Sequence, residues 1–410
     1  MAYTTHSPAI NSSEAGKSRW VLGLLVAFTS SGFVQKYTGV PGLLGYTAVV
    51  CALFSLVPMP PKRFRESLEH HFPLFAGAFL IALALIYLGL HHVEDGRGPG
   101  RSSDRDEGLE IAVTRLLSGE NPYYSEHPVA GPLSLLPGAI LLAVPFVLAG
   151  SVGLQNIFWL GVFLWICGRR LTNRGEFLSL LAVSLAASPS AQYEIISGGD
   201  MIANGAYALC FLILAHDTWT NRDSPIFHKL ATAVLLGIGL ASRANMIFLL
   251  PVLGAFVLRK TDWKQAFGSM TLVGMTYGFI VTSFYLIDPA SFTPLKSREK
   301  IMFDGETLWW ADEAILGLTA TVMIVFFLKS IVETESASLR QLLSISTWIT
   351  ITPMIAMVIL SSATQRKLDC RFMHDRFGLM YLCFAIAAAA CHAGTGCSKR
   401  RNGRQRGECQ

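Results

Sequence analysis

Four acidic side chains lie within seven positions of one polar stretch, at Asp104, Asp106, Glu107 and Glu110. A carboxylate can act as a general base by accepting the proton of a hydroxyl group. Neighbouring carboxylates raise one another's pKa, which favours a base that works near neutral pH. The stretch therefore predicts acid–base chemistry. The alternative is that these acids only cap and solvate a helix at a membrane surface.

Basic side chains that suit an anion occur later in the chain, at Arg243, His374 and Arg376. Cations and hydrogen-bond donors stabilise a phosphate group that leaves during a transfer reaction. An isolated cation at membrane depth is costly, so by default it marks a functional residue. The alternatives are a topological anchor for Arg243 and a structural pair with Asp375 for Arg376.

A further acid, Asp200, follows two glycines in a loop with little else that is polar. It is either a second acid of the site or the N-cap of a helix over 203–217. The pair His91-His92 at the end of an apolar run favours an interfacial position over a metal site. No cysteine pair has a metal-ligand spacing.

The composition predicts a protein that lives in a membrane. The chain is 52% hydrophobic and 15% charged, whereas soluble domains carry about 25% charged residues. The net charge of +5 is spread over the loops and does not indicate a nucleic-acid partner. We expect an all-α fold, a polytopic transmembrane helical bundle. Thirteen apolar intervals are candidate helices: 19–34, 42–58, 73–91, 130–149, 152–168, 177–189, 203–217, 229–241, 245–258, 266–286, 313–330, 343–361 and 377–393.

No segment resembles a separate soluble domain, so we expect a single integral membrane domain over 1–410. Within it, an N-terminal helix pair occupies 1–72. A transmembrane core over 73–393 includes an outer loop at 92–129. The basic segment 394–410 is expected to be a cytoplasmic tail.

Lysine and arginine in short loops favour the cytoplasm and so predict the orientation. Counting from a cytoplasmic N-terminus places the loop 92–129 outside. Counting back from the basic tail instead assigns the chain between residues 130 and 168 to the opposite sides of the membrane, so the two counts disagree there. One of the intervals 130–149 and 152–168 is therefore expected to be re-entrant or interfacial, which gives 12 or 13 helices.

Within the outer loop, an amphipathic pattern predicts a short helix that lies flat at the membrane surface. Gly119 is expected to end this helix, and a turn follows it. The residues of its apolar face are Leu109, Val113, Leu116 and Leu117, and those of the other face are Glu107, Glu110 and Thr114.

These features occur in a recognisable order. Asp106-Glu107 precedes a helix that ends in Gly119-Glu120-Asn121-Pro122-Tyr123, and a proline-initiated apolar run begins at Gly131-Pro132-Leu133. This order resembles the membrane glycosyltransferases of the GT-C superfamily. The branch that uses polyprenol-phosphate mannose is the one that it resembles most.

Three later segments are similar to the same superfamily, namely 188–215 with Asp200, 239–251 with Arg243 and 370–386 with Arg376. Two positions depart from the pattern. Phe377 replaces the tyrosine of an Arg-Tyr motif, and Glu110 occupies a position where the family has an aromatic residue.

The resemblance implies an inverting glycosyltransferase that moves a hexose, such as mannose, from a polyprenyl-phosphate carrier to a glycan or lipid acceptor. The reaction is expected at the outer or lumenal face of the plasma membrane or the endoplasmic reticulum, with the carrier held in the lipid bilayer. No cofactor is certain, a divalent cation is the one candidate, and its ligands are unknown. In order of preference the catalytic candidates are Asp106, Glu107 and Asp104, and the substrate-binding candidates are Asp200, Arg243, His374 and Arg376.

The main alternative is a transporter or flippase of a lipid-linked or small anionic substrate. Such a protein is expected to carry charged residues at mid-membrane and inverted repeats. The apolar intervals here are nearly free of acids. A polymerase or ligase of lipid-linked glycans is a third reading, but its large loop is expected late in the chain rather than early.

Overall fold

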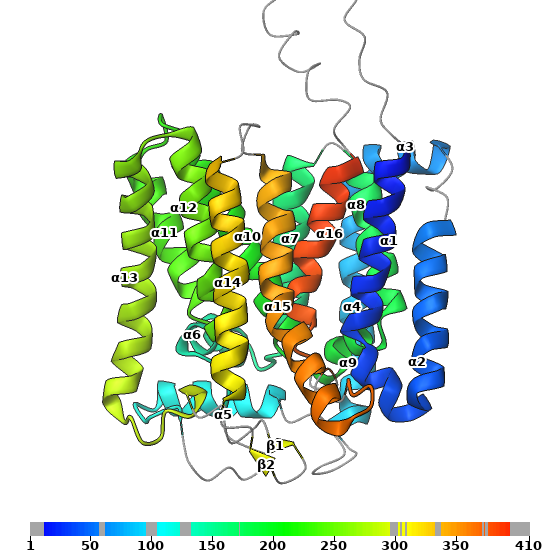
Figure 1. The fold of residues 1–410 in the computed structure, drawn as a ribbon, viewed down its shortest axis with the longest axis horizontal. Coiled ribbons are helices and arrows are strands. Elements are labelled where there is room, and N and C mark those ends of the chain that lie inside the picture. The colour runs from blue at the N-terminus through cyan, green and yellow to red at the C-terminus, as the bar shows by residue number, and fades with distance from the viewer. Residues whose placement is uncertain are drawn as a thin grey trace, which may run out of the picture.

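The computed structural model describes residues 12–56, 62–95, 105–123, 133–171, 173–295, 302–303, 306–307, 310–332, 338–370, 373 and 376–393. Most helices lie side by side along one direction, as Figure 1 shows. Among the described residues, the β-structure is one antiparallel pair of two-residue strands. The fold is therefore the expected all-α helical bundle.

The elements in chain order are α1 (Ser12–Thr29), α2 (Ser31–Leu56), α3 (Lys62–His70), α4 (Phe72–Asp95), α5 (Arg105–Leu117), α6 (Pro137–Leu148), α7 (Leu154–Arg170), α8 (Arg174–Ala187), α9 (Pro189–Ser197), α10 (Met201–Thr220), α11 (Ile226–Leu240), η1 (Ala244–Phe248), α12 (Leu249–Lys260), α13 (Trp263–Ile287), η2 (Thr293–Leu295), β1 (Met302–Phe303), β2 (Glu306–Thr307), α14 (Ala311–Val332), α15 (Leu339–Gln365) and α16 (Leu379–Ala393). Each of the thirteen predicted intervals overlaps a different α-helix. Helices α3, α5 and α9 come in addition, and of these the sequence predicted only α5.

Six of the described helices are long and apolar enough to cross a membrane, namely α2, α4, α10, α13, α14 and α15. A span needs about 20 apolar residues because the hydrocarbon core is about 30 Å thick. The chain is therefore a multi-pass integral membrane protein. Helix α10 is largely buried among other helices, whereas α13 and α14 expose most of their surface.

The two ends of the bundle differ in character. At one end, which we call the loop end, α5 lies across the bundle beside the short strands, as Figure 1 shows. At the opposite end, which we call the basic end, lie α3 and the last turn of α7 with Arg169 and Arg170. The basic residues of α3 and of the end of α7 thus lie at the same end of the bundle.

Helix α6 does not cross the bundle. Its 12 residues extend about 18 Å, which is too short for a span. Near its start, Gly138 donates a backbone hydrogen bond of 2.7 Å to the carbonyl of Ala241, just after α11. Just after its end, the Ser151 hydroxyl lies 2.7 Å from that of Tyr87 on α4. Both ends of α6 thus lie toward the loop end. Of the two intervals of which one was expected to be re-entrant or interfacial, 130–149 is therefore the one whose helix does not cross the bundle.

Helix α5 lies flat at the loop end, as its amphipathic pattern predicts. Leu109 and Val113 are fully buried, together with Ala112. Leu117, which was expected on the same apolar face, is 52% exposed, so this part of the prediction is wrong. The helix ends before Gly119, whose φ of 77° is the left-handed conformation typical of a helix C-terminus.

The N-terminal helices are part of the same packed body. The hydroxyl of Thr29 on α1 donates a hydrogen bond of 2.8 Å to that of Tyr381 on α16. Arg19 forms a 2.7 Å ion pair with Glu176 on α8. Helix α1 is therefore joined to the core by polar contacts as well as by apolar packing.

Helices α10 and α16 pack most closely at a glycine. A Cβ atom at Gly205 of α10 would overlap the backbone carbonyl oxygen of Met380 on α16. Small residues let membrane helices approach at such crossings. This contact sets the distance between α10 and the segment that precedes α16, and both of these contribute to the site.

We therefore expect Gly205→Ala to destabilise the protein by about 1–3 kcal/mol, because a buried backbone atom has to move. The measurement is thermal unfolding of the purified protein in detergent. Gly77→Ala on α4 is the matched control, since a Cβ there meets no atom within 4 Å. Equal unfolding temperatures for the two variants would contradict the close crossing.

Candidate functional site

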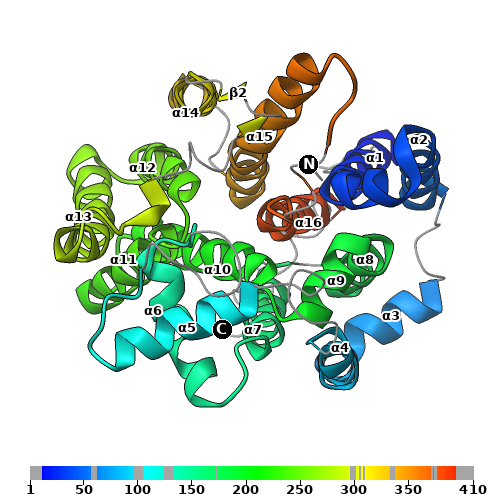
Figure 2. The ribbon, with the colours of Figure 1, turned by 90° about the horizontal axis from the view of Figure 1, so that it is seen from below.

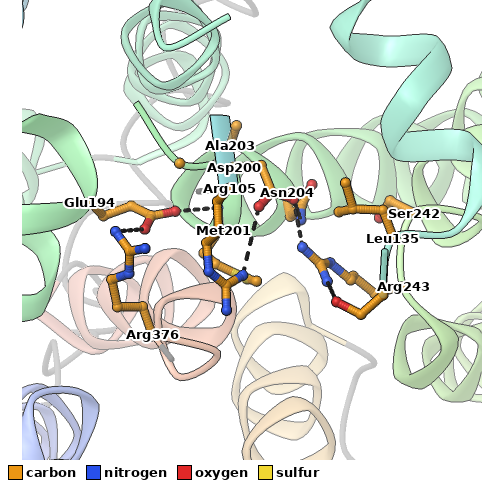
Figure 3. Close-up of polar contacts among 12 residues, drawn as sticks. Arg105, Leu135, Glu194, Asp200, Met201, Ala203, Asn204, Ser242, Arg243 and Arg376 are labelled. Carbon is orange, nitrogen blue, oxygen red and sulfur yellow. Dashed lines mark hydrogen bonds and ion pairs between the residues drawn. The ribbon is translucent and has the colours of Figure 1, made fainter. Parts of the chain in front are cut away.

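Five charged side chains from four separate segments meet inside the loop end. They belong to Arg105, Glu194, Asp200, Arg243 and Arg376, which we call the charged cluster, and Figure 3 shows them together. The cluster contains three guanidinium groups and two carboxylates, and so one excess positive charge. The sequence predicted that Asp200, Arg243 and Arg376 would serve one site, and the structure brings these three together.

Asp200 is the central acid of the cluster and is only 2% exposed. Its Oδ2 atom accepts a hydrogen bond of 2.6 Å from Arg243 Nη2 and another of 2.6 Å from Asn204 Nδ2. The residue occupies the N-cap position of α10, but its side chain accepts no capping hydrogen bond. Of the two alternatives for Asp200, the side-chain cap of this helix is therefore not observed, and the carboxylate lies in the cluster.

Glu194, which the sequence analysis overlooked, performs the capping role. Its carboxylate is fully buried, and Oε1 accepts a 2.6 Å hydrogen bond from the backbone N–H of Met201. Its Oε2 atom lies 2.9 Å from Arg376 Nη1. A Cβ at Gly199 would lie 2.5 Å from Oε1, so the carboxylate fills the space that this glycine leaves. The available signal was that Glu194 is the one charged residue between 188 and 199.

Arg376 is held from three sides. Its Nη1 donates a 2.6 Å hydrogen bond to Ser197 Oγ, in addition to the ion pair with Glu194. Its guanidinium lies 4.8 Å from the ring centroid of Tyr193, an arrangement that favours a cation. The Tyr193 hydroxyl in turn donates a 2.6 Å hydrogen bond to Glu94. The proposed structural partner Asp375 lies outside the described residues.

Arg243 is 5% exposed and lies between two segments of the loop end. Beside its bond to Asp200, its Nη1 is 3.4 Å from Ser134 Oγ. A topological anchor extends into the lipid headgroups, whereas this side chain points inward to an acid, as Figure 3 shows. That alternative for Arg243 is therefore wrong. Its Nε atom is buried and has no hydrogen-bond partner among the described residues.

Arg105 was not singled out in the sequence, although it lies between Asp104 and Asp106. Its Nη1 is 4.0 Å from Asp200 Oδ1. Its guanidinium lies 4.9 Å from the ring centroid of Phe377. The phenylalanine that departs from the family pattern thus provides an aromatic face for this cation.

Asp106 lies on the buried face of α5 and is 6% exposed. It precedes Leu109 and Val113 by three and seven positions, the spacing of one helix face. Its Oδ2 is 3.8 Å from Nε2 of His91 on α4. The other ring nitrogen of His91 is 3.1 Å from the carbonyl oxygen of Ile196. Nε2 of His91 thus faces the Asp106 carboxylate, at a distance longer than a direct hydrogen bond.

A tight turn joins the Asp106–His91 pair to the charged cluster. Gly198 has a φ of 73°, and a Cβ there would lie 3.5 Å from both Asp106 Cβ and His91 Cε1. The next residues, Gly199 and Asp200, enter the cluster directly. Glycine is favoured here because the turn requires a left-handed backbone conformation.

The remaining candidates are less informative. Glu107 is partly exposed on α5. Asp104 and His374 lie outside the described residues. Within the described residues, no three histidine, cysteine or acidic side chains are placed to share a metal ion. The structure thus offers no ligand set for the candidate divalent cation in that part of the chain.

The turn after α5 fixes a wall of the site. The Asn121 side chain accepts a 3.1 Å hydrogen bond from the N–H of Tyr123. The buried Tyr123 hydroxyl donates a 3.0 Å hydrogen bond to the carbonyl of Leu135. Leu136 in turn donates a 3.1 Å backbone hydrogen bond to Ser242, beside Arg243. The Asn-Pro-Tyr segment thus positions backbone next to the cluster rather than supplying a reactive group.

The electrostatic balance of the cluster keeps Asp200 ionised. Burial by itself raises the pKa of this carboxyl group, but Arg243 and Arg105 lower it, and the net pKa lies below the ordinary value. A carboxylate with two cationic neighbours is a poor proton acceptor. Asp200 is therefore suited to holding the arginines in place.

No model of a known protein family matches this chain, and neither a curated protein nor a solved structure shows significant similarity to it.

The ion pair of Asp200 gives a prediction for stability. Asp200→Asn leaves Arg243 buried without its counter-charge, which is expected to cost about 3–5 kcal/mol. Because the folded-state pKa is lowered, this contribution is complete above the unfolded pKa of about 3.9 and is lost as the pH falls below it. The difference in unfolding temperature between wild type and variant should thus be constant from about pH 5 to 8 and shrink in stronger acid.

The matched control is Asp223→Asn, which removes an exposed carboxylate from the connection between α10 and α11. We expect this variant to unfold at the wild-type temperature throughout the range. An Asp200→Asn protein as stable as the control at neutral pH would show that the pair does not hold the loop end together.

Proposed function

We propose that this protein is an inverting membrane glycosyltransferase that moves a hexose from a polyprenyl-phosphate carrier to a glycan or lipid acceptor. The observation that carries the proposal is the cluster of two buried arginines and the partly exposed Arg105 beside a buried carboxylate at one end of a transmembrane bundle. The resemblance of the loop segments to the GT-C superfamily is in accord with this arrangement. The identity of the hexose, such as mannose, is part of the proposal.

The position of the cluster suits a carrier whose lipid tail stays in the bilayer. Asp200 directly precedes α10, which has 20 residues. Such a helix is about 30 Å long, the thickness of the hydrocarbon core. The cluster is thus expected at the level of the lipid headgroups, where a carrier phosphate resides.

The arginines suit the carrier phosphate. The cluster has one guanidinium more than it has carboxylates, and guanidinium groups bind phosphate with directional hydrogen bonds. Arg243 retains a buried Nε–H without a partner among the described residues. In the proposed reaction these cations stabilise the negative charge on the phosphate as its bond to the sugar breaks.

Asp106 suits the base. The acceptor hydroxyl oxygen attacks the anomeric carbon, the bond from that carbon to the phosphate oxygen breaks, and the hydroxyl proton passes to the Asp106 carboxylate. Attack opposite the leaving group inverts the anomeric configuration. His91, 3.8 Å from Asp106, can take up the proton afterwards. Glu107 is the second candidate for the base and Asp104 the third.

The transporter or flippase reading has less support. It calls for charged groups halfway along the helices. The buried ion pairs of the described residues lie instead near the two ends, with Arg19–Glu176 at the basic end and Arg243–Asp200 at the loop end. Transport of a lipid-linked substrate without sugar transfer would favour that reading.

The proposal places the loop end outside the cytoplasm, on the exterior or lumenal side. We expect a cysteine at Glu110, which is exposed on α5, to react with an impermeant maleimide in intact cells or sealed vesicles. A cysteine at Lys260, exposed at the basic end, should react only after permeabilisation. Both are introduced into a chain whose native cysteines are replaced by alanine. The opposite labelling pattern would invert the orientation.

The decisive activity measurement is hexose transfer from radiolabelled polyprenyl-phosphate hexoses in membranes that contain the protein. Asp106→Asn keeps the size of the side chain and removes the base, so we expect transfer to fall by about 100-fold or more. Glu107→Gln should reduce transfer less, because Asp106 remains. Glu110→Gln is the matched control on the exposed side of the same helix and should keep wild-type transfer.

Each variant is compared with wild type by thermal unfolding, so that loss of folding is separated from loss of chemistry. A folded Asp106→Asn protein with wild-type transfer would remove this residue from the mechanism. A wild type that transfers no hexose but moves the labelled lipid across sealed vesicles would replace the enzyme with a flippase.

A further inference from the structure

A groove lies at the basic end of the bundle, on the opposite side from the charged cluster. It is formed by α1, α15 and α16 and encloses a cavity of about 370 Å³. Figure 2 shows α16 set back between α1 and α15, so that these two helices form walls and α16 forms the floor. The volume lies within the range of pockets that hold small ligands.

The walls of the groove follow regular helix faces. On α1 the lining residues include Lys17, Val21 and Leu25, which follow one another at intervals of one turn. Leu25 comes eight positions after Lys17, so the wall extends about 12 Å along the helix. On α15 the wall begins at Arg340 and ends at Trp348, again eight positions further on.

The floor is made of small side chains. It consists of Ala385, Ala388 and Ala389, which face the groove from α16. Alanine adds little volume, so a narrow apolar chain can lie against the helix backbone. A flat apolar floor between two apolar walls suits a hydrocarbon chain better than a compact polar ligand.

The charges of the groove lie at one end only. Arg340 lies in the first turn of α15 and Lys17 in the second turn of α1, and both helices start at the basic end. The side chains deeper along the walls are apolar or hydroxyl-bearing, among them Leu25 and Thr347. The Thr347 hydroxyl already donates a hydrogen bond to the backbone of its own helix, so it does not need a polar group of a ligand as a partner. The groove is therefore cationic at its mouth and apolar inside.

We propose that this groove binds one anionic phospholipid from the leaflet at the basic end, with an acyl chain along Ala385 and Ala388 and the headgroup phosphate between Lys17 and Arg340. Two cations at the level of the headgroups attract an anionic lipid more strongly than a zwitterionic one, whose own ammonium offsets its phosphate. Trp348, which is 43% exposed, extends the apolar wall toward the bilayer. The inference does not depend on the proposed activity, because the groove and the cluster occupy opposite ends.

The test uses the full chain in nanodiscs made from equal parts of phosphatidylglycerol and phosphatidylcholine. After exchange into detergent, native mass spectrometry counts the lipids that each protein molecule retains. We expect wild type to retain one phosphatidylglycerol in preference to phosphatidylcholine. Replacing both cations, Lys17→Gln with Arg340→Gln, should reduce this preference by roughly fivefold for each charge removed.

Two further variants separate the groove from general effects. Ala388→Leu fills the floor and should abolish retention while both cations remain. Lys260→Gln is the control for charge, since it removes a cation of the basic end outside the groove. Gly317→Leu is the control for size, since it introduces a leucine on α14, where a Cβ meets no atom within 4 Å. Both controls should retain lipid as wild type does.

Equal retention of the two lipids by wild type would overturn the proposal, and so would unchanged retention in the variants that alter the groove. A dimeric wild type that dissociates in the Ala388→Leu variant would also overturn it, because the occupant would then be a helix of a second copy of this chain.

Discussion

A charge that leaves water needs an opposite charge or several hydrogen bonds, and this requirement sets the arrangement of the loop end. The ion pair between Asp200 and Arg243, at 2.6 Å, joins the start of α10 to the segment between α11 and α12. The pair between Glu194 and Arg376, at 2.9 Å, joins α9 to the segment before α16. Helices that are otherwise held by apolar packing thereby acquire one fixed set of positions at this end.

The two buried acids of the cluster differ from Asp106 in their surroundings. Glu194 and Asp200 are bonded to guanidinium groups, which fixes the positions of the arginines. Asp106 lies on α5, and its Oδ2 is 3.8 Å from Nε2 of His91 on α4. The proposed reaction assigns Glu194 and Asp200 to positioning cations and Asp106 to accepting a proton.

The sequence predicted the helices and part of the site, for identifiable reasons. Apolar runs and the turn at Gly119 are local signals, so the thirteen intervals and the end of α5 were predicted correctly. Glu194 and Arg105 were missed because their roles depend on partners that are distant in the chain. Glu194, for example, pairs with Arg376, which also donates a hydrogen bond to Ser197 from 179 positions away. The short α6 could not be distinguished from a span by composition, because only its contacts place both of its ends on one side. The activity itself stays a prediction.

The contact between α1 and α16 has a consequence for biosynthesis. Thr29 and Tyr381, which share a buried hydrogen bond, are separated by 352 positions. Domains form from the N-terminus onward during synthesis, so α1 enters the membrane long before the helix against which it packs exists. Until Leu379 and the residues after it have been inserted, the inner face of α1 is covered by lipid or by a chaperone. A chain interrupted before α16 thus exposes a recognisable unfinished surface within the bilayer, where quality control can act.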